Sequence, residues 1–316
     1  MNLRIFFILL AFGAFGLTSC EDDDDNAPSI ELRDPEEVAV ENGEDIEAFL
    51  ATHFYEIEDN PTNPNFKIFK FDTIAGENQD RTPIADSPLL SDTTIIQRGV
   101  SYKLNYLILR QGNTQERKPK FTDSTLVTFQ GVTINNDLFE AAPNPLWLDL
   151  TQNVIRGFYE LMTKLNGSSG FVENPDGTLT FNDDFGMGVV FVPSGLGYFA
   201  SPPPGSGILR YQPIIFNVQL YRSRLTDHDR DGIPSFMEDF NNNGQISDLP
   251  EGDNPGDDLD GDGLPNYLDR NDDGDDVITI DEVSDEDGNI DLNNLPDHDN
   301  DGVPDYLDPD FPEEDA

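Results

Sequence analysis

The chain has few cysteines, histidines and basic residues, and each shortage excludes a class of structure or activity. Cys20 is the only cysteine among 316 residues, so no disulfide can form within the chain. The 63 Asp and Glu outnumber the 18 Lys and Arg, and a formal charge of -45 excludes nucleic acid as a partner because phosphates require positive charge. The histidines are scattered at His53, His228 and His298, and the sequence has no nucleophile–base pattern and no phosphate-binding glycine loop.

The first twenty residues have the pattern of an export signal. In MNLRIFFILLAFGAFGLTSC, one Arg precedes an apolar run that ends in small residues before Cys20. A lone membrane span is the alternative, although the run is short for one. The final LTSC resembles the lipobox of bacterial lipoproteins, which implies cleavage before Cys20 and lipidation of this residue.

An acidic run follows the lipobox. Residues 21–29 begin with EDDDDN, whose adjacent carboxylates repel and have nothing to bury, so we expect a solvated tether. This run resembles the surface-export signal of Bacteroidota lipoproteins. Together the two resemblances imply an outer-membrane lipoprotein on the periplasmic or cell-surface face, attached to the membrane through its N-terminal lipid.

Composition divides the rest of the chain into three parts. We predict an N-terminal α/β extension over residues 30–97, an α+β domain over 98–224 and an irregular acidic tail over 225–316. The tail holds 32 Asp and Glu but only two Arg, which is about two-thirds of the net charge of the chain. Two such different compositions in one chain indicate two regions that are stabilised in different ways.

Hydrophobic periodicity predicts the elements. In the extension, apolar residues at helical spacing predict a helix over 42–57 with Asn42 as its cap, and alternation predicts a strand over 66–74. In the second part, one helical pattern covers 153–167. Alternation predicts a strand over 100–112, and strand-rich stretches predict four more, over 123–134, 145–150, 187–193 and 212–222. An antiparallel sheet with one helix packed across it is an α+β arrangement.

The α+β part carries a family resemblance. LVTFQGVTINNDLFEAAPNPLWLDLTQNVIRGFYELM, then VVFVPSGLGYFASPPPGSG and PIIFNVQL, resemble in sequence and order the FKBP-type peptidyl-prolyl cis-trans isomerases. The resemblance implies an antiparallel twisted sheet wrapped on one helix. It also implies that the domain isomerises proline-containing segments of exported proteins.

The resemblance further implies a mostly aromatic proline pocket. Its positions in this sequence are Phe129, Phe139, Glu140, Leu146, Val154, Ile155, Phe158, Tyr198 and Phe216. Phe129 stands where the family usually has Tyr, Glu140 where it has Asp and Phe158 where it has Trp. Leu146 takes an aromatic position. The alternative is that these aromatic side chains are simply the core of a small β-domain.

Such a pocket needs no cofactor for catalysis. The barrier to rotation about an X–Pro bond is about 18–20 kcal/mol and comes from the double-bond character of the amide. A dry apolar pocket favours the twisted, less polar transition state over the planar ground state. The Tyr198 hydroxyl or the Ile155 backbone N–H would hold the substrate carbonyls in register.

Between the predicted helix and the fourth strand, residues 166–188 form an insertion. NPDGT between FVE and LTF is a hairpin signal, so we expect a protruding β-hairpin near the pocket. The hairpin is either a substrate-guiding flap or a decoration.

The tail repeats a calcium-loop pattern. Residues 227–238, 258–269 and 297–308 share Asp at positions 1, 3 and 5, Gly at 6 and a carboxylate at 12. The predicted Ca²⁺ ligands are Asp227, Asp229, Asp231, Glu238, Asp258, Asp260, Asp262, Asp269, Asp297, Asp299, Asp301 and Asp308. Weaker copies begin at Asp239 and Asp269, and the shared Asp269 resembles the overlap of thrombospondin type 3 repeats. A disordered acidic tail is the alternative.

Three functions remain open from the sequence. The first is a lipid-anchored peptidyl-prolyl isomerase with a calcium-ordered tail. The second is an FKBP-like module that binds proline-containing peptides without turnover. The third is a structural surface lipoprotein whose α+β domain is a scaffold.

Overall fold

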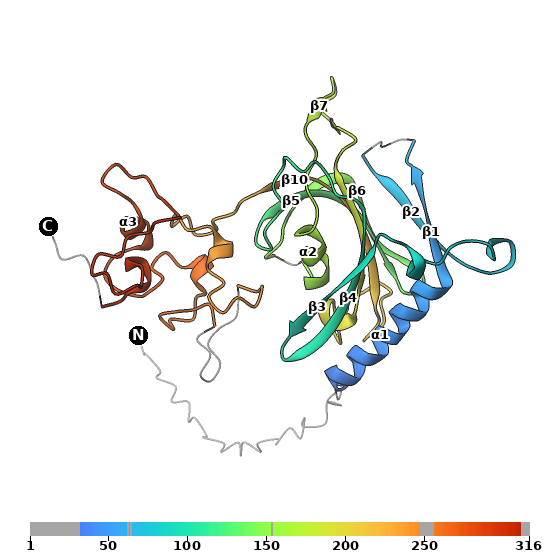
Figure 1. The fold of residues 1–316 in the computed structure, drawn as a ribbon, viewed down its shortest axis with the longest axis horizontal. Helices are drawn as coiled ribbons and strands as arrows, with labels where there is room; N and C mark the ends of the chain where they lie inside the picture. The colour runs from blue at the N-terminus through green and yellow to red at the C-terminus, as the bar shows by residue number, and fades with distance from the viewer. Residues whose placement is uncertain (1–31, 62, 64, 153, 247–255, 311–316) are drawn as a thin grey trace, which may run out of the picture. The chain divides into compact units, whose positions relative to one another are not determined.

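The computed structural model describes residues 32–310 except 62, 64, 153 and 247–255 (Figure 1). The predicted signal segment, Cys20 and the acidic tether lie outside the described residues. Among the described residues, no helix is both long enough and apolar enough to cross a membrane.

The main sheet has six antiparallel strands in the order β3-β4-β9-β10-β5-β6. The strands are β3 (Leu90–Gln97), β4 (Val100–Arg110), β5 (Ser124–Thr133), β6 (Leu138–Asp149), β9 (Gly186–Val192) and β10 (Ile214–Arg224). The predicted α+β class with an antiparallel sheet is therefore confirmed. β10 pairs with β9, the strand that directly precedes it, and with β5, which lies far from it in sequence, so the sheet is completed only when this last strand joins β9 to β5.

One face of the sheet packs against the short helix α2 (Arg156–Met162). Phe158, Leu161 and Met162 point into a core that includes Val190 and Val192 of β9. A Cβ on Gly157 would collide with the Val192 side chain, so this glycine allows the helix to approach the strand closely. The predicted helix is confirmed but is shorter than 153–167.

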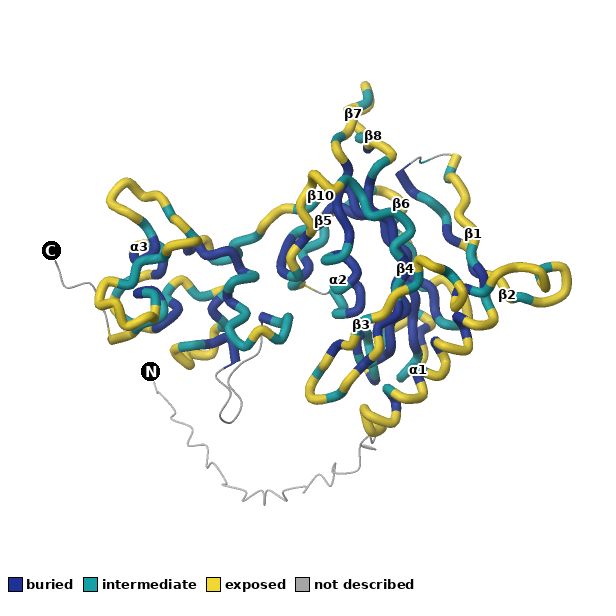
Figure 2. The backbone as a smooth tube through the Cα atoms, viewed as in Figure 1, coloured by how far each residue is buried: buried dark blue, intermediate teal, exposed yellow. Residues whose placement is uncertain are grey.

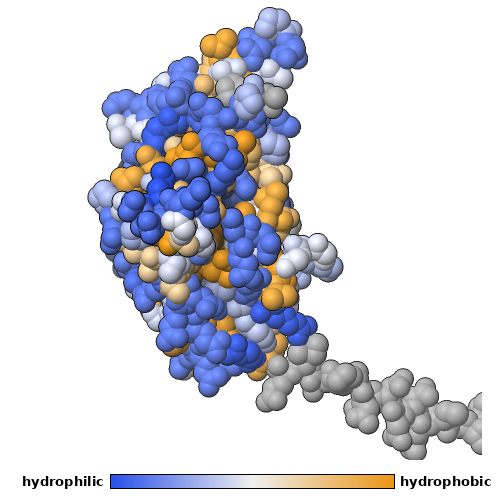
Figure 3. Space-filling model, turned by 90° about the vertical axis from the view of Figure 1, so that its right-hand side faces the viewer, coloured by the Kyte–Doolittle hydropathy of each residue, from blue (hydrophilic) through white to orange (hydrophobic). Residues whose placement is uncertain are grey.

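The opposite face of the sheet is covered by helix α1 (Pro35–Thr52) and the hairpin of β1 (His53–Asp59) and β2 (Lys67–Thr73). Side chains alternate along β9, so Val189 and Phe191 point to this second core. In Figure 2 the strands of the sheet are mostly buried, whereas much of α1 is exposed. Figure 3 views this side and shows a mostly hydrophilic surface with apolar groups in narrow patches.

Helix α1 begins seven residues before the predicted start at 42 because Asp34 is its N-cap, with Oδ1 accepting from the Glu36 and Glu37 amides. The prediction that Asn42 caps the helix was wrong. Asn42 is buried inside it, donates to the Tyr211 carbonyl and accepts from the Ser194 amide. The helix also ends at Thr52, so the second part of the predicted helix is β1.

The sheet includes part of the predicted extension. β3 lies within 30–97 and pairs with β4 along its whole length. The predicted boundary at residue 98 therefore falls inside a β-hairpin, between Gln97 and Val100. Residues 34–310, as far as they are described, belong to one compact unit.

The tail has little regular structure. Each of the three calcium-type loops contains a one-turn 3₁₀ helix directly after its Pro, and the described part of the tail has one short α-helix, α3 (Thr279–Val283). The 3₁₀ helices are Ser235–Met237, Asn266–Leu268 and Asp305–Leu307. Ile233, Val283 and Tyr306 form a small apolar cluster of their own.

Candidate functional site

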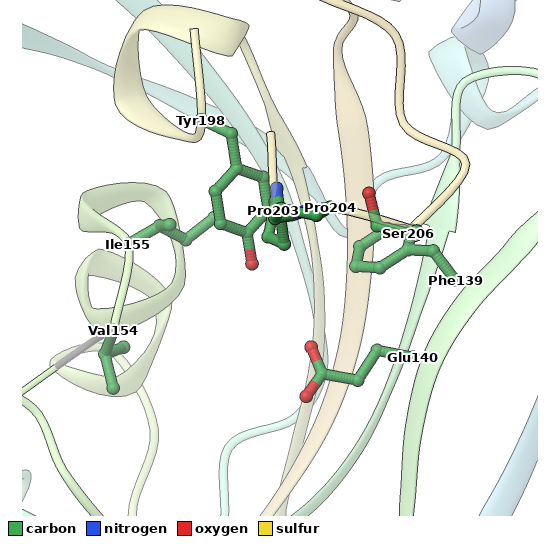
Figure 4. A pocket seen from close by; sticks show the side chains of 9 residues that line it. Phe139, Glu140, Val154, Ile155, Tyr198, Pro203, Pro204 and Ser206 are labelled. Carbon is green, nitrogen blue, oxygen red and sulfur yellow. The ribbon is translucent and has the colours of Figure 1, made fainter. Parts of the chain in front are cut away.

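A cavity of about 750 Å³ opens beside the start of α2 (Figure 4). Three segments supply its walls: the start of β6, the residues that lead into α2, and the loop between β9 and β10. The lining residues are Phe139, Glu140, Val154, Ile155, Tyr198, Pro203, Pro204, Gly205 and Ser206. The cavity is thus formed mainly by apolar side chains with a few polar groups.

Aromatic rings form the floor beneath the cavity. Phe216 is 3% exposed and contacts Phe139, Phe158 and Phe129 edge to face, with ring centroids 5.4, 5.3 and 6.0 Å away. A Cβ on Gly131 would lie 2.5 Å from Phe139 and 2.8 Å from Phe216, so only glycine leaves room for both rings. The floor is therefore fixed by tight packing.

The structure places the nine predicted pocket residues in two layers. Five of them line the cavity, namely Phe139, Glu140, Val154, Ile155 and Tyr198. Phe129, Phe158 and Phe216 lie behind them in the core, and Leu146 packs against this core without lining the cavity. The aromatic residues therefore belong to the core of the domain and also form the floor of the cavity. The two alternatives from the sequence, a proline pocket and a simple core, are compatible.

The loop that carries Tyr198 is held from several sides. The Ser194 amide donates to Asn42 of α1, and the Tyr211 amide donates to the Phe199 carbonyl and closes the loop. Phe199 has a left-handed backbone with φ of 46° and stacks edge to face on Tyr211. These contacts fix the direction of the Tyr198 side chain.

Sequence reasoning missed the outer wall. Pro203, Pro204, Gly205 and Ser206 all belong to the SPPPGSG segment, which the family resemblance included but did not assign to the pocket. Its three consecutive prolines, each with a fixed φ, were the available signal for a stiff wall.

The polar groups of the cavity face one another. In Figure 4 the Glu140 carboxylate and the Tyr198 hydroxyl both point into the space between β6 and α2. Burial, and then the charge of Glu140, raises the pKa of the Tyr198 hydroxyl above its ordinary value. Partial burial also raises the pKa of Glu140. The cavity is thus less hydrated than open surface.

The predicted hairpin is present as β7 (Phe171–Glu173) and β8 (Leu179–Phe181). It packs away from the cavity, because Phe181 stacks on Tyr221 at a centroid distance of 4.4 Å and the Leu179 carbonyl accepts from Asn65. None of its residues lines the cavity. The expectation of a hairpin near the pocket was wrong, and the flap alternative has no support.

The three calcium-type loops share one backbone geometry. In each, the glycine at position 6 has a φ near 100°: Gly232 at +100°, Gly263 at +98° and Gly302 at +101°. In each, its amide donates to Oδ2 of the first Asp, at 3.2, 3.0 and 3.2 Å. Carboxylates at positions 1, 3 and 5 come together in all three loops. A disordered tail would show no such repetition.

The carboxylates at position 12 do not all close their own loops. Buried Glu238 joins Asp231 and Asp272, which comes from a later repeat, within 4.8 Å. Asp269 and Asp308 belong to none of the carboxylate groups among the described residues. The structure thus does not group Asp269 and Asp308 with the other carboxylates of their own loops, and their role as Ca²⁺ ligands stays a prediction.

A further group, Asp273, Asp275 and Glu282, lies outside the predicted ligand set, although Asp273 and Asp275 fall within the weaker copy that begins at Asp269. Counted from Asn271, these residues stand at positions 3, 5 and 12 of a calcium-type loop. The glycine stands at position 4 instead of 6, which hid the pattern.

Charge is concentrated in the buried cross-repeat group. Glu238 is 0% and Asp272 1% exposed, and no described group donates a hydrogen bond to either carboxylate oxygen of either side chain. Burial, and then the Asp272 charge, raises the pKa of Glu238 to about 11, and burial raises that of Asp272 to about 9. Hard oxygen ligands that lack donors are suited to a cation such as Ca²⁺.

The tail contacts the α+β part beside the cavity. The Arg156 guanidinium donates to the Asn243 carbonyl at 2.7 Å, and the Tyr159 hydroxyl donates to the Gly244 carbonyl at 3.1 Å. His228 Nε2 lies 3.1 Å from Asp149 Oδ2. Arg156 directly follows the cavity residue Ile155, so the first turn of α2 contacts both regions.

Comparisons with known proteins give three findings. A family model described as BamM C-terminal matches residues 228–295. No curated protein matches the chain. Among solved structures, a peptidyl-prolyl cis-trans isomerase from Pseudomonas syringae pv. tomato is similar, with 16% identity over 44% of this chain and 83% of that one and a TM-score of 0.32. FkpA from Escherichia coli is 20% identical over 44% of this chain and 54% of its own, also with a TM-score of 0.32.

Proposed function

We propose that this chain is a lipid-anchored peptidyl-prolyl cis-trans isomerase that acts on proline-containing segments of exported proteins. The observation that carries the proposal is the cavity with an aromatic floor beside the start of α2. Five of its lining residues stand at positions that the FKBP resemblance implies.

The cavity performs the reaction by excluding water from the prolyl amide. The prolyl ring enters over Phe139, with Val154 and Ile155 as one wall, and the amide loses hydration as it enters. The planar amide is more polar than the twisted one, so loss of water disfavours the ground state more than the transition state. The Tyr198 hydroxyl and the Ile155 amide donate hydrogen bonds to substrate carbonyls and keep the chain in register.

The direct test is a rate measurement on an Xaa-Pro peptide. Uncatalysed exchange takes tens to hundreds of seconds, so a catalyst is readily seen by NMR exchange spectroscopy or in a protease-coupled assay. Acceleration proportional to the concentration of folded chain supports the isomerase. Peptide binding without acceleration would instead support a non-catalytic proline-binding module, which the substitutions at Phe129 and Phe158 favour.

The tail is proposed to be a structural calcium-binding segment. The supporting observations are the repeated loop geometry and the buried carboxylates of Glu238 and Asp272, which lack donors, beside Asp231, where only Oδ2 lacks one. Without a cation these like charges would repel in a poorly hydrated site. Calorimetric titration of the full chain tests this, and no binding at millimolar Ca²⁺ would contradict it.

Attachment to the membrane is proposed from the lipobox resemblance, and the outer membrane from this and the acidic-run resemblance together. Replacing the predicted acylation site, Cys20→Ser, is expected to move the protein from the membrane to the soluble fraction, since the lipid would be lost. Fractionation after a high-salt wash measures this. If the variant still sediments with membranes, the anchor proposal fails. If attachment holds but isomerase activity and peptide binding are both absent, a structural surface lipoprotein is the remaining alternative.

A further inference from the structure

Glu140 is the single charged side chain among the described residues that line the cavity. It stands on β6 next to Phe139, and its carboxylate points into the cavity toward the Tyr198 hydroxyl (Figure 4). The other lining residues are apolar or uncharged, so the charge of the site is set by this one group.

The protein supplies no counterion for Glu140 among the described residues. On the opposite wall, Arg156 directly follows the lining residue Ile155. Its guanidinium, however, donates to the Ile96 and Asn243 carbonyls and to the Gln97 side chain. Its Nε is directed at Glu160. Arg156 is thus fully engaged away from the cavity, and the Glu140 charge is available to a ligand.

A ligand that fills the cavity removes more water from Glu140. Removing water from a carboxylate costs free energy unless a cation or a hydrogen-bond donor replaces the water. Glu140 is exposed, but partial burial already raises the pKa of its carboxyl, and a ligand would add to this desolvation. A peptide with a cationic side chain next to its proline would offset this cost, and an acidic one would add repulsion.

We infer that Glu140 makes the pocket selective for prolines flanked by Lys or Arg, an inference that rests on the proposed proline-binding function. The selectivity is local. The net charge of -45 attracts every basic segment from a distance, but it does so regardless of where the proline lies. A single substitution at Glu140 separates the two effects, because it leaves nearly all of the long-range field unchanged.

The experiment uses the full chain with Ca²⁺ and peptides that differ only in one residue beside the proline: Lys, Gln or Glu, placed before or after it. Kd and kcat/KM are measured for each. Wild type is expected to favour Lys over Gln about two- to fivefold at one of the two positions, the range of an exposed ion pair. The preference should weaken in high salt.

Three variants complete the design. Glu140→Gln should reduce the Lys-to-Gln ratio to about one, and Glu140→Lys should reverse the order so that the Glu peptide binds best. Asp92→Asn removes an exposed charge on β3 outside the cavity and should leave the ratio unchanged. Melting curves verify that each variant is folded.

The outcomes are distinguishable. An unchanged Lys preference in Glu140→Gln, or no preference in wild type, overturns the inference. The proposed function still stands in that case if wild type binds or isomerises the peptides. If no peptide binds or is isomerised by folded wild type, the proposed function fails and the inference fails with it.

Discussion

The two regions of the chain bury opposite kinds of side chain. The six-stranded sheet buries apolar residues on both faces, such as Phe191 on one and Phe216 on the other. The tail buries carboxylates, with Asp231, Glu238 and Asp272 no more than 1% exposed. Exclusion of water from apolar groups stabilises the first region under all ordinary conditions, whereas we expect the second to depend on a cation.

The apolar clusters follow the same division. The three clusters of the sheet contain no residue beyond Tyr221, and the tail cluster of Ile233, Val283 and Tyr306 contains no residue of the sheet region. Polar contacts such as that of Arg156 to Asn243 join the two regions. We therefore expect each region to respond to its own perturbation.

The largest expected effect is that of calcium removal. A chelator should expand the tail and expose residues 225–310 to protease, because the clustered carboxylates then repel. The sheet region should keep its melting transition. Limited proteolysis with mass spectrometry measures both, and equal protection of the tail with and without Ca²⁺ would contradict the account.

Next is Phe216→Ala, which opens a cavity under the pocket floor. Truncation of a buried Phe costs about 3–5 kcal/mol of unfolding free energy. Denaturant unfolding should show this loss in the sheet region, while the number of bound Ca²⁺ stays the same. The matched control is Leu264→Ala in the tail, where the side chain is 39% exposed and the cost should stay within about 0.5 kcal/mol.

Asp272→Asn tests the cross-repeat site. The substitution keeps the size of the side chain but removes one of three carboxylates, so we expect one fewer Ca²⁺ per chain by calorimetry or mass spectrometry. Exposed Asp276 stands four positions further on, and Asp276→Asn is the control that should keep the full number. Equal stoichiometry in both variants would show that Asp272 is not a ligand.

The smallest effect is expected for Tyr198→Phe. This change removes one hydroxyl and almost no volume from the cavity. Loss of one hydrogen bond to the substrate costs about 0.5–1.5 kcal/mol, which lowers kcat/KM roughly threefold to tenfold. An unchanged kcat/KM would mean that the hydroxyl does not contact the substrate.

The sequence predicted those strands and helices whose pattern lies within one short stretch of neighbouring residues. Alternation predicted β4, and runs of β-branched and aromatic residues predicted β5, β9 and β10, whose side chains are buried on both faces of the sheet. The first half of β6 was missed, since its residues around Pro143 resemble a loop. The start of α1 was readable from Asp34 followed by a proline, but the helix was placed by its apolar residues instead.

The same distinction applies to the sites. The glycine turns of the calcium-type loops and the cavity residues Phe139 and Tyr198 follow from short motifs. The joining of Glu238 to Asp272 depends on where a later repeat folds back in space, which no spacing within a twelve-residue loop encodes. The Pro203–Ser206 wall likewise depends on how a long loop returns to the sheet.

The most direct test of the account is the exchange rate of a Xaa-Pro peptide in the presence of the folded, calcium-loaded wild-type chain. The account predicts acceleration that scales with protein concentration and survives removal of Ca²⁺, because the cavity belongs to the region stabilised by apolar packing. No acceleration of any of several Xaa-Pro peptides by a folded sample would contradict it.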